Sequence, residues 1–158
     1  NKLVKVKPNI KFSSDFIIGY PGETYNDFKK TVDLMNKIGF INSFSFMFSA
    51  RPGTPAFNLE KIKEKDVKSR LLEFQSTAEK IKTSYRKKLI KKTAKVLFEN
   101  KMKSGSRYFG RDEYFNSVIV ENSSDLTGKI KNVKILKVNQ NTLFGEVIPN
   151  LNQTNYAA

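Results

Sequence analysis

The stretch DFIIGYPGET, from Asp15 to Thr24, decides the fold because it joins a strand, a loop and a helix start. The apolar run from Ile10 to Ile18 predicts a buried strand, which ends at Gly19 in a loop rich in Pro and Gly. Thr24 can cap the following helix, since Asp27 stands three residues later at the capping-box position. A strand therefore leads directly into a helix.

The residues after Thr24 extend this pattern to a strand–helix–strand unit. Apolar side chains recur at helical spacing until Gly39 ends the helix: Phe28, Val32, Met35 and Ile38. Residues 40–49 then alternate, with Phe44, Phe46 and Phe48 on one face of a second strand. Such a unit predicts parallel strands with a right-handed crossover, and ligands then bind at the carboxyl ends of the strands. Those ends are residues 19–23 and 49–54.

The two strand ends supply the candidate ligand contacts of this part of the chain. Gly19 and Gly22 allow a ligand to approach the backbone closely, although the same loop is compatible with a simple packing turn. Arg51 can hold a carboxylate or phosphate group, or it is a surface residue in a rigid turn. Asp15 and Glu23 are candidate acid–base groups, with local hydrogen bonding as the alternative role.

Beyond residue 60 the pattern changes from a helical period to a period of two. One long helix, or two shorter ones, is predicted from Lys61 to about Lys92. Its apolar stripe consists of Val67, Leu71, Phe74, Ala78, Ile81, Tyr85 and Leu89. Five short strands are then expected at residues 94–99, 106–110, 116–121, 130–138 and 142–148. This succession predicts a small antiparallel β-barrel of the OB-like type.

The charge of the chain predicts a polyanionic partner. The formal net charge is +14, and residues 80–111 hold 12 Lys and Arg but a single acid, Glu99. Nucleic acid is expected ahead of a membrane surface. The candidate RNA contacts are Lys87, Lys88, Lys91, Lys92, Lys95, Arg107 and Arg111. Tyr108 and Phe109 lie within this run, where their rings can stack on bases. The alternative is a solvated helix face with these aromatic residues in the core.

Later lysines, Lys129, Lys131, Lys134 and Lys137, have two interpretations. They form a second edge of the same cationic surface, or they protect an exposed strand edge against aggregation. The chain has no Cys and no His, which excludes disulfides, thiolate chemistry and Cys-ligated clusters within it. No apolar run is long enough to span a membrane, so a soluble cytoplasmic protein is expected.

Several motifs, in family order and spacing, make the chain similar to the radical-SAM methylthiotransferases, whose cofactor is S-adenosylmethionine (SAM). Besides DFIIGYPGET they are FSFMFSARPGTPA (44–56), Arg70-Leu71 with Gln75, FGRDEYFNSVIVE (109–121), DLTGKIKNVKI (125–135) and LFGEVI (143–148). The sequences of these motifs most resemble those of the MiaB-like branch. Its members convert N6-isopentenyladenosine beside the tRNA anticodon to its 2-methylthio form. The final β-domain resembles the TRAM domain, an RNA-binding module.

The resemblance implies an architecture and a division of labour. Residues 1–88 would be the C-terminal part of a radical-SAM (β/α) partial barrel, 89–150 the TRAM domain, and 151–158 a flexible tail. Ile17, Gly19 and Arg51 would lie at the SAM site, and the basic β-domain would bind the tRNA anticodon stem-loop. SAM and two 4Fe-4S clusters would serve the full-length enzyme, with the cluster cysteines in N-terminal domains that precede this chain.

The chain begins at Asn1 and lacks the cluster ligands, so we expect a piece of a longer protein that is inactive alone and monomeric. Two alternatives remain open at this point. The first is a fragment of the sister enzymes that methylthiolate an aspartate of a ribosomal protein. The second is a non-catalytic RNA-binding module.

Overall fold

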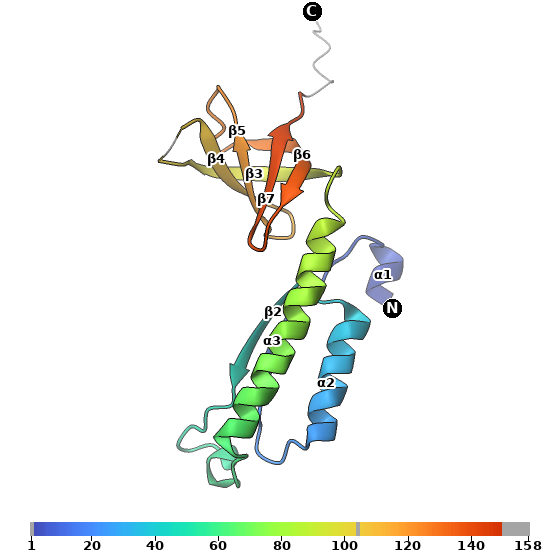
Figure 1. Cartoon of the computed structure of the whole chain (residues 1–158), viewed down its shortest axis with the longest axis vertical. Coiled ribbons are helices and arrows are strands. Elements are labelled where there is room, and N and C mark those ends of the chain that lie inside the picture. Colours follow the sequence, from blue (N-terminus) through green and yellow to red (C-terminus); the bar gives the residue numbers. More distant parts are fainter. Residues whose placement is uncertain (1, 104, 150–158) are drawn as a thin grey trace, which may run out of the picture. The chain divides into compact units, whose positions relative to one another are not determined.

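A computed structural model describes residues 2–103 and 105–149, so the expected tail at 151–158 lies outside the described residues. The chain divides between Ser84 and Tyr85 into two compact units (Figure 1). The first unit contains α1 (Lys2–Val6), β1 (Ser13–Ile18), α2 (Tyr25–Ile38), β2 (Asn42–Met47), the 3-10 helix η1 (Pro55–Asn58) and most of α3 (Glu64–Lys87). The second unit contains β3 (Thr93–Lys101), β4 (Arg107–Asp112), β5 (Ser117–Glu121), β6 (Ile130–Val138) and β7 (Thr142–Val147).

The first unit contains the predicted parallel strand–helix–strand arrangement. β1 pairs with β2 in parallel, from Ser13 opposite Asn42 to Ile18 opposite Met47. The capping box that begins α2 is complete, because Asp27 N donates to Thr24 Oγ1 while Thr24 N donates to the Asp27 carboxylate. The hydroxyl of Thr24 also donates to this carboxylate at 2.6 Å and lowers the pKa of Asp27. Gly39 ends the helix in the left-handed conformation, as expected.

Only one face of this small sheet is covered within the described part of the first unit. Ile18, Phe28, Met35 and Phe74 form its buried core, with Phe16 packed against them. On the opposite face, Ile17, Phe44 and Phe46 are exposed, Ile17 at 61%. Ile38, the last residue of α2, is 42% exposed and lies outside the buried stripe of Phe28, Val32 and Met35.

α3 is a single helix that ends at Lys87, and the apolar stripe predicted for residues 61–92 contributes to two cores. Phe74 is buried in the first unit, where Leu71, Ala78 and Ile81 pack against the same cluster. Leu89, just after the helix, packs against the core of the second unit. The sequence stripe is therefore shared between two hydrophobic cores.

The five predicted strands are present and close into a barrel in the order β3-β4-β5-β7-β6. The expectation of a wholly antiparallel barrel was wrong, because β5 and β7 pair in parallel. The reason is geometric. A closed ring with an odd number of strands cannot alternate direction at every neighbour, so at least one pair must be parallel.

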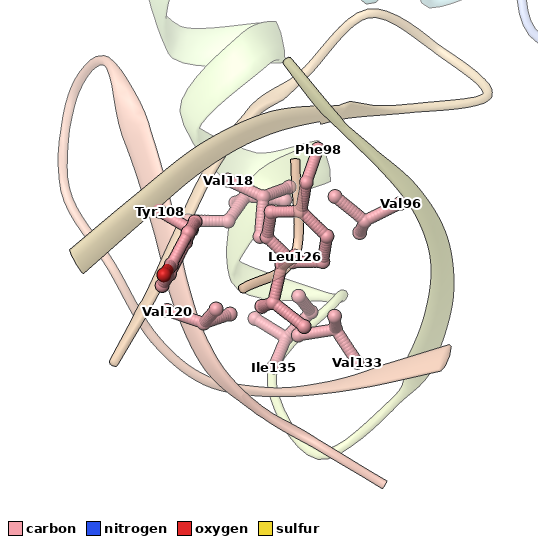
Figure 2. Close-up of a cluster of buried hydrophobic side chains, with 9 residues drawn as sticks. Val96, Phe98, Tyr108, Val118, Val120, Leu126, Val133 and Ile135 are labelled. Atoms are coloured by element: carbon pink, nitrogen blue, oxygen red, sulfur yellow. The ribbon is translucent and has the colours of Figure 1, made fainter. Parts of the chain in front are cut away.

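The barrel encloses a hydrophobic core made of alternating strand residues and of Leu126 from the loop between β5 and β6 (Figure 2). Its buried members are Val96, Phe98, Tyr108, Val118, Val120, Leu126, Val133, Ile135 and Leu143. Two strand crossings leave no room for a side chain. A Cβ at Gly110 would lie 2.4 Å from the Leu97 carbonyl oxygen, and a Cβ at Gly145 would lie 2.4 Å from that of Lys134.

A buried polar cluster links the end of α3 to the β4–β5 and β6–β7 turns of the barrel through hydrogen bonds. Arg86 donates to the Gln140 carbonyl oxygen and to Asn116 Oδ1. The carboxylate of Asp112 accepts from the backbone and the side-chain amide of Asn116. Burial, with the nearby charge of Asp112, raises the pKa of Tyr85 to about 12. Residues 85–87 therefore belong structurally to the barrel.

Gly110→Ala should destabilise the barrel by about 2–3 kcal/mol, the upper part of the range for overpacking, because the new methyl group meets backbone rather than a movable side chain. The matched control is Gly128→Ala, where a Cβ meets open space at a φ of +72° and costs about 1 kcal/mol. Urea unfolding of the whole chain, followed by NMR signals of barrel residues, measures both. Equal losses would mean that β3 and β4 do not approach so closely.

Candidate functional site

Two cavities open where β1 and β2 end, at the position expected for a ligand site. The larger, of about 600 Å³, is lined by Ile17 and Arg51 together with Phe46, Met47 and Phe48. The smaller, of about 370 Å³, is lined by Gly19 and by Ile62 and Val67 from the segment that leads into α3 and from its first turn. The structure thus brings Ile17 and Arg51 to one cavity and places Gly19 beside a second. Met47 and Phe48 line both.

A buried ion pair fixes the loop that carries Gly19. Arg70 Nη1 donates to Glu23 Oε2 and to the Glu23 carbonyl oxygen, each at 2.8 Å. The same carboxylate oxygen accepts the backbone N–H of Gly19 at 3.1 Å. Both charged side chains are only 12% exposed. Glu23 therefore fixes the loop, and no local sequence pattern predicts its partner Arg70, which lies on α3.

Gly19 is confined by its surroundings as well as by its conformation. Its φ is +80°, a region that L-residues rarely adopt. A Cβ there would lie 2.5 Å from Cγ1 of Val67. Close packing of α3 on the loop therefore requires glycine at this position.

The basic residues of the barrel unit fall into two chemically different sets. The two candidate arginines are paired with acids on neighbouring strands: Arg107 Nε lies 3.0 Å from Glu121 Oε1, and Arg111 Nε lies 3.0 Å from Glu99 Oε1. The guanidinium of Arg111 also covers the ring of Phe109, 5.5 Å from its centroid. In the described part of the chain, the five candidate lysines Lys87, Lys88, Lys91, Lys92 and Lys95 form no ion pair.

Strand pairing places the later lysines beside the earlier ones. β3 pairs with β6 so that Thr93 lies opposite Lys134 and Lys95 lies opposite Asn132. Because β6 also pairs with β7, it is not an edge strand, and edge protection does not explain its lysines. Lys95 on β3 therefore lies on the same strand pair as Lys131, Lys134 and Lys137 on β6.

The aromatic residues differ from the stacking expectation. Tyr108 is 3% exposed within the barrel core, so its ring is not on the surface; that expectation was wrong for Tyr108. Phe109 alternates with it, points outward and is half-buried. Phe115 was not singled out from the sequence. It is 74% exposed in the β4–β5 turn and has a φ of 59°, which is unusual for a bulky residue.

No group of three or more Asp, Glu, His or Cys in the described part of the chain is arranged to hold a metal ion. No helix there is both long and apolar enough to cross a membrane.

Comparisons with known proteins agree with these features. Residues 87–148 match the TRAM domain family. Over 146 residues the chain is 49% identical to a tRNA-2-methylthio-N(6)-dimethylallyladenosine synthase of Pelagibacter ubique (strain HTCC1062), covering 92% of this chain and 33% of that protein. Identity to the enzymes of the same name from Wolbachia pipientis wMel and Enterobacter sp. (strain 638) is 40% and 39%. These matches cover 89% and 93% of this chain, but 33% and 31% of the relatives. The chain spans about one third of the length of these curated relatives.

The buried pair predicts that Arg70→Ala destabilises the first unit by about 1.5–3 kcal/mol, because it leaves the Glu23 carboxylate without its charged donor. Amide exchange at Gly19 should also accelerate, since the carboxylate is no longer held in place. Lys29→Ala is the matched control, because the Lys29–Glu73 pair is of similar length, 3.1 Å, but solvent-exposed. It should cost at most about 1 kcal/mol. Similar losses in both variants, with unchanged exchange at Gly19, would contradict the fixing role.

Proposed function

We propose that this chain, which contains a TRAM domain at residues 87–148, is the C-terminal part of a radical-SAM tRNA methylthiotransferase. The observation that carries the proposal is the similarity of almost the whole chain to one third of the tRNA-2-methylthio-N(6)-dimethylallyladenosine synthases. The full protein would add a methylthio group to C2 of N6-isopentenyladenosine next to the anticodon. Because its partner is tRNA, we place it in the cytoplasm.

The iron–sulfur clusters of such an enzyme do not fit this chain. It has no Cys and no His, and the described residues hold no cluster of potential metal ligands. Both clusters would therefore be bound by the other two thirds of the protein. The part described by the structure would contribute to SAM binding and tRNA binding.

The cavity at the ends of β1 and β2 suits one side of a SAM molecule, which supplies the radical chemistry when bound. Ile17 and Phe46 offer an apolar wall for the adenine, and Arg51 offers a cation for the amino-acid carboxylate. Arg70 and Glu23 would keep the Gly19 loop in place beside it. Ile17, Phe44 and Phe46 are exposed on the uncovered sheet face, which the rest of a partial barrel would enclose.

The barrel unit would bind the anticodon stem-loop of tRNA through its cations. The candidate lysines form no ion pair among the described residues, so they are available to phosphate groups. A ribosomal-protein substrate is less well supported, because the relatives are named for a modified adenosine in tRNA.

The electrostatic part of the proposal predicts salt-sensitive binding of tRNA by the whole chain. If about six phosphates are contacted, the logarithm of the association constant should fall with the logarithm of salt concentration at a slope of roughly −4. Fluorescence anisotropy with a labelled tRNA transcript between low and moderate salt measures it. Affinity that does not change with salt would reject phosphate contacts as the source of binding.

The SAM part predicts that Arg51→Met in the full-length protein weakens SAM binding by roughly tenfold to a hundredfold, the value of a charge-assisted hydrogen bond. Equilibrium dialysis with radiolabelled SAM measures this directly, without turnover. Lys61→Met, a cation that lines the neighbouring cavity instead, is the control and should change the affinity little. Unchanged SAM affinity in Arg51→Met would remove Arg51 from the site.

A further inference from the structure

We infer that the phosphates of the RNA are held by lysines on the β3–β6 strand pair, and that Arg107 and Arg111 on β4 contribute little. This inference rests on the proposed tRNA binding and names the surface that performs it. The lysine strip is defined as Lys91, Lys92, Lys95, Lys134 and Lys137. It combines residues from two segments that lie far apart in the sequence.

Barrel closure brings the members of the strip together. Lys134 lies opposite Thr93, and Lys95 follows Thr93 by two residues on β3. Lys95 and Lys134 are therefore diagonal neighbours, with Cα atoms about 7–8 Å apart. Lys91 N donates to the Ile135 carbonyl oxygen at 2.7 Å, and Ile135 N donates to the Lys92 carbonyl oxygen. These two hydrogen bonds hold Lys91 and Lys92, which precede β3, against β6. Lys137 follows on β6 after an irregularity in the β6–β7 register.

The charge on the strip is largely uncompensated by acids. Glu146 is paired with Lys134 across β6 and β7, but the described residues show no ion pair between their side chains. Four further lysines of the strip therefore add positive charge without a paired carboxylate. A polyanion with regularly spaced phosphates is the partner that this arrangement fits.

Arg107 and Arg111 attract an approaching phosphate less than the lysine strip does. Each is bound to a glutamate, so each pair carries no net charge. A phosphate that bound either guanidinium group would lie close to the glutamate carboxylate that already accepts from its Nε, so the two anions would repel each other. Exposed ion pairs are weak and can be broken, but the repulsion from Glu99 or Glu121 would offset much of the gain.

The backbone at Lys91 supports a role for its side chain. Its φ is 67°, in the left-handed region where glycine is the least strained residue. Lysine at this position therefore costs folding energy, and the fold itself does not need it. Lys91→Gly should separate the two roles, keeping the unfolding midpoint unchanged or raising it while weakening RNA binding.

The experiment compares two double variants of the whole chain that remove the same net charge. Lys95→Gln with Lys134→Gln removes two strip lysines, and Arg107→Gln with Arg111→Gln removes the two paired arginines. Binding of a labelled tRNA transcript is measured over a range of salt concentrations. Each lost phosphate contact to a single strand should reduce the salt slope by about 0.7, so the lysine variant should lose about 1.4 and the arginine variant little.

The possible results distinguish a failure of the lysine strip from a failure of the proposed tRNA binding. A wild-type chain that fails to bind the transcript even at low salt would overturn the proposed tRNA binding itself. Salt-sensitive wild-type binding that falls equally in both double variants, or more in the arginine variant, would overturn the lysine strip alone. Loss confined to the lysine variant, with weakened binding by a stably folded Lys91→Gly, supports it.

Discussion

Closure of the five-stranded barrel is the constraint on which the arrangement of functional groups depends. Closure pairs β3 with β6, two strands well separated in the sequence, and so converts two lysine-rich segments into one surface. Glycines at Gly110 and Gly145 permit it, because their positions lie against the backbone of the neighbouring strand. Because the barrel is closed, β6 has a partner strand on both sides, and the ring of Tyr108 is buried in the core. Charge distribution in this domain is therefore a consequence of strand topology.

The first unit presents the complementary situation, a sheet that is incompletely covered. Parallel strands are normally buried on both faces, yet β1 and β2 expose Ile17, Phe44 and Phe46 on one side. The curated relatives are about three times as long as this chain. Further strands and loops from the remaining sequence would cover that face and complete the ligand cavity near Arg51, in keeping with the proposed function.

Local features of the fold were predictable because short-range chemistry determines them. The reciprocal hydrogen bonds of Thr24 and Asp27, the end of α2 at Gly39 and the five barrel strands all follow from spacing within a few residues. Long-range features were not predictable in this way. Neither the partnership of Arg70 with Glu23 nor the parallel β5–β7 pair leaves a periodic signal. Tyr108 and Phe109 are adjacent in sequence, and only strand register decides which ring is buried.

If RNA lies along the β3–β6 strand pair, NMR on the isotope-labelled chain can locate it there. Adding an unlabelled anticodon stem-loop should shift the amide signals of residues 91–95 and 134–137, together with the ammonium signals of their lysines. Signals of the first unit and of the arginine–glutamate pairs should change little. Shifts concentrated on β4 and β5, with the β3–β6 signals unmoved, would contradict the account.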